Sequence, residues 1–173
     1  AFRTIGRQHN SSLLLIADNC VEIKADVLYE AAELASYKFD KYKTKKSEDD
    51  KDENKDENKF ALSEIFVADK LCAKCSAKGK IFAESQILTR ELANEPGCVI
   101  NPPVLAEIAA AKAKEFNLEC EIWDEAKLKA EGCGAILAVG SGSATPPRMI
   151  HLVYKPKNKA RKKIAFVGKG ITF

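Results

Sequence analysis

The sequence lacks any hydrophobic run long enough to cross a membrane as a helix. Its longest local apolar runs, Leu13–Ala17 and Ala135–Val139, are far shorter than the roughly 18 residues that such a span needs. It also lacks a leader with a basic start, an apolar stretch and a small-residue cleavage site, and it begins with Ala1 instead of Met. These absences exclude a helical membrane protein and predict a cytosolic location.

Histidine is scarce, and the glycine motifs are incomplete. The two histidines, His9 and His151, are far in sequence from any Cys or His partner, so no imidazole metal site is expected. Gly132–Gly134 and Gly140–Gly142 do not complete a dinucleotide fingerprint, and Val167–Gly170 lacks the upstream glycine of a phosphate-binding loop. These glycines are better read as turn residues.

The overall composition is that of an ordinary globular protein. The 173 residues are 46% apolar and 31% charged, and 28 Lys and Arg face 25 Asp and Glu, for a net charge of +3. This excludes collagen-like, mucin-like and wholly disordered chains, and it is too small a charge to imply a polyanion partner. One basic cluster could follow a phosphate backbone, although such a run is more commonly a solvated connection. Its members are Lys155, Lys157, Lys159, Arg161, Lys162 and Lys163.

The six cysteines do not read as a disulfide framework, because the chain is large enough to build a core without cross-links and has no export signal. Cys72-Ala-Lys-Cys75 is the one pair with the spacing of a zinc or redox site. A structural zinc site needs a second such pair, which the other cysteines do not provide. Two buried reduced thiols on a helix are therefore the preferred interpretation.

Periodicity predicts an α/β protein. In the first 70 residues we expect a strand at Ser12–Asp18, a helix at Lys24–Tyr42 and a strand at Phe60–Ala68. Between the last two, Lys45–Lys59 contains twelve charged residues, no apolar ones and a tandem Lys-Asp-Glu-Asn, which predicts a disordered surface insertion.

The rest of the chain alternates in the same way. A long helix is expected at Leu71–Ala93, ended by Asn94–Gly97, followed by helices and short apolar strands. The helices are expected at Pro102–Phe116 and Glu125–Ala130, and the strands at Glu119–Trp123, Ala135–Val139, Met149–Tyr154 and Ile164–Val167.

Several segments resemble the cytosol, or leucyl, aminopeptidase family. They are Phe39–Lys43, Arg90–Gly97, Asn101–Pro103, Ala138–Pro156 and Ile164–Phe173. The resemblance covers nearly all of the chain except the charged insertion. It implies the end of an amino-terminal α/β domain at 1–70, a linker helix at 71–95 and the start of an α/β metallo-aminopeptidase catalytic domain at 96–173.

The resemblance also implies a chemistry. Members of the family remove amino-terminal residues, often leucine, from peptides with two divalent metal ions, commonly zinc with manganese or magnesium accepted at one position, and they form hexamers built as dimers of trimers. The family's metal-binding lysine in its Val-Gly-Lys-Gly segment matches Lys169. A lysine coordinates a cation only as the neutral amine, so the metal must displace its proton.

The sequence departs from the family pattern at Phe173, where the family continues at once with an aspartate ligand and a glycine pair. The other ligands and the catalytic groups are expected downstream, so no catalytic residue is assigned. The chain is expected to be a piece of a longer enzyme and to be inactive alone. Two alternatives stay open: a non-catalytic assembly module, in which Lys169 has no special role, and a less favoured DNA-binding role for the basic cluster.

Overall fold

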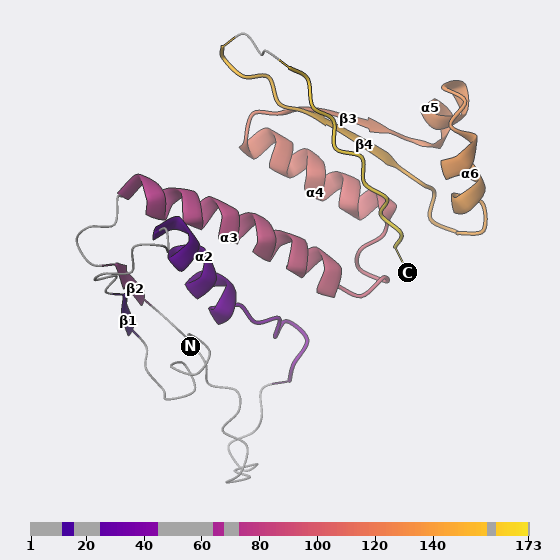
Figure 1. Cartoon of the computed structure of the whole chain (residues 1–173). Coiled ribbons are helices and arrows are strands. Elements are labelled where there is room, and N and C mark those ends of the chain that lie inside the picture. Colours follow the sequence, from indigo (N-terminus) through magenta and orange to yellow (C-terminus); the bar gives the residue numbers. More distant parts are fainter. Residues whose placement is uncertain (1–11, 16–24, 45–63, 68–72, 159–161, 173) are drawn as a thin grey trace. The chain divides into compact units, whose positions relative to one another are not determined.

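The computed structural model describes residues 12–15, 25–44, 64–67, 73–158 and 162–172. The chain divides into two compact units, Ala1–Asn94 and Glu95–Phe173 (Figure 1). Both combine helices with a small sheet, so the protein has the predicted α/β fold. Within the described ranges, no helix is long and apolar enough to span a membrane.

The first unit contains a parallel strand pair. Strand β1 (Ser12–Leu15) pairs with β2 (Glu64–Val67), with Ser12 opposite Glu64 and Leu15 opposite Val67. Parallel strands cannot be joined by a tight hairpin and need a crossover connection. Helix α2 (Ala25–Ser36) lies between the two strands in the sequence and is part of that connection.

Helix α3 (Ala73–Asn94) follows β2 and packs along α2. Successive residues along α2 contact successive residues along α3, so the two helices run parallel to each other. They join Asp26 with Lys78, Glu30 with Gln86, Leu34 with Arg90, and Tyr37 with Asn94. Small residues allow the close approach, because Ala32 and Ala83 are buried and a Cβ on Gly79 would collide with the backbone of Asp26.

The second unit is built around α4 (Pro102–Glu115), which lies against a two-stranded antiparallel sheet. The sheet pairs β3 (Glu119–Trp123) with β4 (Met149–Val153). Asn117 has a left-handed φ of 52° directly after the helix, and the Leu118 N–H bonds back to the carbonyl of Ala113. This turn ends α4 and directs the chain into β3.

Two short helices, α5 (Glu125–Ala130) and α6 (Gly134–Gly140), connect β3 to β4. The Asp124 carboxylate caps α5 by accepting a hydrogen bond from the Lys127 N–H at 2.9 Å. Leu128 is fully buried and anchors α5, which contacts both α6 and β3.

Most predicted elements are confirmed. The helices expected at Lys24–Tyr42, Leu71–Ala93, Pro102–Phe116 and Glu125–Ala130 correspond to α2, α3, α4 and α5, and the strands at Glu119–Trp123 and Met149–Tyr154 to β3 and β4. The predicted extension of the first of these helices to Tyr42 is wrong, because α2 ends at Ser36 and residues 37–42 are not helical. Strands β1 and β2 lie inside Ser12–Asp18 and Phe60–Ala68, whose other residues are outside the described ranges, as is the Lys45–Lys59 insertion. The role of α3 as a linker between domains stays a prediction.

Two predicted strands are wrong. Residues Ala135–Val139 form most of α6, because a short apolar run between glycines is compatible with either a helix or a strand and periodicity alone does not decide. Residues Ile164–Val167 are irregular, and their side chains are exposed, Phe166 by 95% and Val167 by 98%. A β-strand requires a hydrogen-bonded neighbour, and no strand of the described sheets pairs with this segment.

Candidate functional site

Lys169 lies in the irregular segment formed by residues 162–172. Its side chain is exposed, and among the described residues its amine has no hydrogen-bond or ion-pair partner. Gly168, immediately before it, has open space around its Cα. The amine is therefore available to an external ligand.

The described residues do not make up a metal centre by themselves. No group of three or more His, Cys, Asp or Glu among them could hold a metal ion. Lys169 fits the role of a single donor, because its amine has no partner among the described residues. A complete centre would need several ligands, and any others would have to come from outside the described part of the chain.

The segment that carries Lys169 passes near the start of α4. A Cβ placed on Gly170 would lie 4.0 Å from Leu105 Cδ2, so the backbone at Gly170 passes beside this side chain. Leu105 is in the first turn of α4, which Asn101 caps by accepting a hydrogen bond from the Val104 N–H at 3.1 Å. Two motifs separated by about 65 residues, Asn101–Pro103 and Val167–Gly170, thus lie near each other.

The predicted basic cluster is only partly described. The Lys155 amine is 2.6 Å from a Glu119 carboxylate oxygen, across the β3–β4 sheet, so an acidic group already neutralises this lysine. Lys157, Lys162 and Lys163 are exposed, and Lys159 and Arg161 lie outside the described ranges. Nucleic-acid binding by this cluster stays a prediction.

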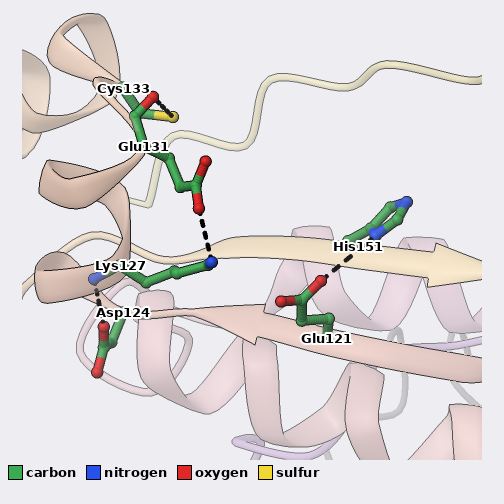
Figure 2. A network of polar contacts seen from close by, with 6 residues as sticks. All are labelled: Glu121, Asp124, Lys127, Glu131, Cys133 and His151. Carbon is green, nitrogen blue, oxygen red and sulfur yellow. Dashed lines mark hydrogen bonds and ion pairs between the residues drawn. The ribbon is translucent and has the colours of Figure 1, made fainter.

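A polar network joins α5 to the end of β3 (Figure 2). The Lys127 amine donates to a Glu131 carboxylate oxygen at 2.6 Å. This hydrogen bond and the negative charge of Glu131 raise the pKa of Lys127 above its usual range. Lys127 also lies 5.3 Å from the centre of the Trp123 ring. Because the hydrogen bonds serve the helix and its cap, we interpret the network as structural.

Sequence reasoning missed one pair in the same view. Glu121 and His151 are directly opposite each other on β3 and β4, with 3.9 Å between the His151 Nδ1 and a carboxylate oxygen (Figure 2). Both side chains are more than half exposed. The strand register would have revealed the pair, but register cannot be read from two isolated strands. The expectation that His151 forms no imidazole metal site stays a prediction.

Two adjoining hollows lie between α5, α6 and the loop after α6, with volumes of about 450 and 550 Å³. Their polar groups are mostly used locally. The Ser141 hydroxyl donates to the Ala138 carbonyl, the Ser143 hydroxyl accepts from the Thr145 N–H, and Arg148 donates to the Pro147 carbonyl. These interactions shape the loop after α6.

The structure describes the side chains of three of the six cysteines. Cys98, Cys120 and Cys133 are free thiols. Cys20 and Cys72 are outside the described residues, and so is the side chain of Cys75, although its backbone belongs to α3. The alternative roles of the Cys72–Cys75 pair therefore stay predictions.

Comparison with known proteins gives a consistent picture. A model of the cytosol aminopeptidase family, catalytic domain, matches residues 87–173. A protein named "Probable cytosol aminopeptidase" from Aquifex aeolicus is 49% identical over 144 residues, which are 83% of this chain and 27% of that protein. Another of the same name from Campylobacter jejuni is 37% identical over 181 residues, covering 100% of this chain and 36% of that protein. The chain spans about a third of the length of these curated relatives.

Solved structures agree on the fold. The bottromycin maturation enzyme BotP in complex with Mn matches with a TM-score of 0.72 and 27% identity, over 91% of this chain and 33% of that one. A mutant of tomato leucine aminopeptidase matches with a TM-score of 0.68 and 21% identity, over 93% of this chain and 34% of that one.

Proposed function

Because this chain belongs to the cytosol aminopeptidase family, we propose that the whole protein is a metallo-aminopeptidase and that Lys169 is one of its metal ligands. The observation that carries the proposal is the family match over residues 87–173, which includes the Val167–Gly170 segment. Since the chain covers 27% of one relative and 36% of another, we further propose that it is a piece of that enzyme and inactive alone.

The proposed reaction is hydrolysis of the first peptide bond of a peptide, with leucine as a favoured amino-terminal residue. The name of the tomato enzyme supports leucine, and the Mn complex of BotP supports a divalent metal. A divalent metal centre that Lys169 helps to hold would supply Lewis-acid polarisation of the scissile carbonyl and activation of a water for its attack. The contribution of this chain is the amine of Lys169, which is exposed and has no partner among the described residues.

The cellular context is part of the same proposal. We place the enzyme in the cytoplasm, as the family's name indicates, and we propose a homo-hexamer of the intact chain, zinc as the usual metal, and manganese or magnesium as the accepted alternative at one position.

The proposal is tested in the full-length protein by replacing Lys169 with Ala. The control is Lys163→Ala, which removes another exposed lysine from the same segment. Loss of a ligand should lower leucyl-amide hydrolysis by more than the roughly 10–100-fold that loss of an outer-shell partner costs, and it should weaken Mn²⁺ binding measured by titration of the apoprotein. The control should keep both properties.

The outcomes separate the proposal from the non-catalytic alternative. If the full-length protein hydrolyses no amino-terminal amide with Zn²⁺, Mn²⁺ or Mg²⁺, the assembly module becomes the better assignment. If it is active and Lys169→Ala matches the control, the family function stands and the ligand assignment is wrong. Metal-dependent leucine release by residues 1–173 alone would show that this piece is sufficient, against the proposal.

A further inference from the structure

The two adjoining hollows beside α5 share three lining residues, which are Glu125, Lys129 and Pro146. The hollows therefore meet at the face of α5 that carries Glu125 and Lys129. Their volumes, about 450 and 550 Å³, lie within the roughly 300–1,000 Å³ that is typical of small-molecule sites. None of the lining residues belongs to the segment 162–172, so Lys169 has no part in the walls of either hollow.

Two opposite charges at this junction are not used by the described part of the protein. Glu125 and Lys129 are four residues apart, so they lie on the same face of α5. Among the residues that the structure describes, neither side chain has a hydrogen-bond or ion-pair partner. The neighbouring carboxylate of Asp124 is occupied, because it accepts the hydrogen bond that caps α5. One carboxylate and one ammonium group are thus left to bind a ligand.

The first hollow adds a second positive group. Arg148 lines it together with Lys129, and the Arg148 guanidinium donates to the Pro147 carbonyl at 2.9 Å. A guanidinium carries five N–H donors, so this bond holds the group in place and leaves other donors for an anion. An arginine and a lysine on the wall of one hollow favour a carboxylate as the bound group.

The second hollow has a mostly apolar wall. Leu137, Ala144, Pro146 and Pro147 line it, and all of them except Ala144 are half-buried. The wall is held in shape, because a Cβ on Gly140 would lie 2.7 Å from Pro147 Cγ, which shows how closely the end of α6 approaches this ring. A wall of this composition favours an aliphatic side chain.

We propose that the joined hollows bind a free α-amino acid with an aliphatic side chain. Glu125 binds its ammonium group, Lys129 and Arg148 bind its carboxylate in the first hollow, and its side chain lies in the second hollow. A ligand with charge of one sign, such as inorganic phosphate, would leave one of the two charges on α5 without a partner. The site stands on its own residues and goes beyond the proposed function, under which its ligand is of the class that the enzyme releases as a product.

The experiment titrates the full-length protein with L-leucine after its metal has been removed, so that binding at a metal centre does not interfere. Three other probes each lack one feature of leucine: L-leucinamide lacks the carboxylate, 4-methylpentanoate lacks the ammonium group, and glycine lacks the side chain. Calorimetry should show that leucine binds more tightly than each of the three. Leucine should also slow amide hydrogen exchange in α5 and in residues 141–147.

Two variants test the role given to each charge. Glu125→Gln should weaken leucine binding on the order of 10-fold and leave 4-methylpentanoate binding unchanged, because that probe has no ammonium group. Lys129→Gln should weaken leucine binding by a similar factor and leave leucinamide binding unchanged. The matched controls are Glu107→Gln and Lys114→Gln, which neutralise exposed residues of α4 and should bind leucine as the wild type does.

The possible failures are distinguishable. If the metal-free protein binds no leucine, or if Glu125→Gln and Lys129→Gln bind it as tightly as the two controls, the hollows are not an amino-acid site. The same conclusion follows if inorganic phosphate binds as tightly as leucine. If both variants weaken leucine binding and Lys169→Ala does not weaken Mn²⁺ binding, the amino-acid site is confirmed, and the ligand assignment in the proposed function is the part that fails.

Discussion

In the first unit, helices α2 and α3 pack closely because Gly79 has no side chain, whereas in the second unit the buried side chain of Leu128 holds the short helix α5. Helices α2 and α3 approach so closely at Gly79 that a Cβ there would lie 3.1 Å from both the carbonyl carbon and the Cα of Asp26. Helix α5 instead depends on Leu128, the largest fully buried side chain among the described residues. The first contact should be sensitive to added atoms and the second to removed atoms.

Replacing Leu128 by Ala should give the largest effect. The substitution leaves a cavity beside α6 and β3, and such changes at fully buried sites cost about 2–5 kcal/mol. Amide exchange of α5 and β3 in the full-length protein should accelerate accordingly. Val139→Ala is the control, because Val139 is 68% exposed on α6 and its loss should change stability by less than about 0.5 kcal/mol. Equal effects of the two changes would mean that Leu128 does not anchor α5.

Replacing Gly79 by Ala should give the next largest effect on stability. It should destabilise the protein, whereas the same change in an ordinary helix stabilises it. In an ordinary helix interior this change stabilises by about 1 kcal/mol. Here the new methyl group collides with the Asp26 backbone, which cannot rotate away as a flexible side chain could, so we expect a net loss of about 1–3 kcal/mol. The loss should appear as faster amide exchange in α2 and α3.

The matched control for Gly79→Ala is Gly134→Ala at the start of α6, where a Cβ would meet no atom within 4 Å. It should be neutral or stabilise by up to about 1 kcal/mol. If Gly79→Ala and Gly134→Ala change stability equally, helices α2 and α3 can move apart to accept the extra methyl group without loss of stability. The contact at Gly79 would then not be sensitive to added atoms.

The same contrast explains which parts of the fold the sequence predicts. Helix α4 was predictable because its start carries a cap and two prolines, Asn101–Pro103, which are local signals. The close contact at Gly79 was not, since a glycine inside a helical pattern looks like a weakness until its neighbour is known. Residues Ala135–Val139 were assigned wrongly because only tertiary context separates a buried strand from a short helix.

Only part of the candidate site could be predicted from the sequence. Lys169 was identified from its resemblance to a family motif, and no property of its neighbours in the sequence marks it as a ligand. The proximity of Gly170 to Leu105 depends on how the end of the chain folds back toward α4, so the sequence could not predict it. The Glu121–His151 pair required the strand register.

The smallest predicted effect concerns charge at the helix contact of the first unit. Burial alone would raise the pKa of Asp26, but hydrogen bonds from Lys78 and from the Val27 N–H, together with the positive charge of Lys78, outweigh it and lower the pKa below its usual value of 3.8. A carboxyl group whose pKa is lowered by folding stabilises the folded state above its unfolded pKa. That contribution is lost as the pH falls through the folded pKa.

Asp26→Asn should therefore destabilise α2 and α3 at pH 7, and the difference from the wild type should shrink as the pH falls from 7 through the folded pKa of Asp26 and the wild-type carboxyl becomes protonated. The measurement is urea unfolding of the full-length protein, followed in the first unit, across this pH range. Glu84→Gln is the control, because its pair with Lys80 is exposed on both sides and should contribute about 0.5 kcal/mol or less. If Asp26→Asn is as stable as the wild type at every pH, the charge of Asp26 does not contribute at this contact, because Asn keeps the shape of the side chain and removes its charge. The packing of α2 against α3 would then depend on steric fit, which the close approach of the two helices at Gly79 already makes necessary.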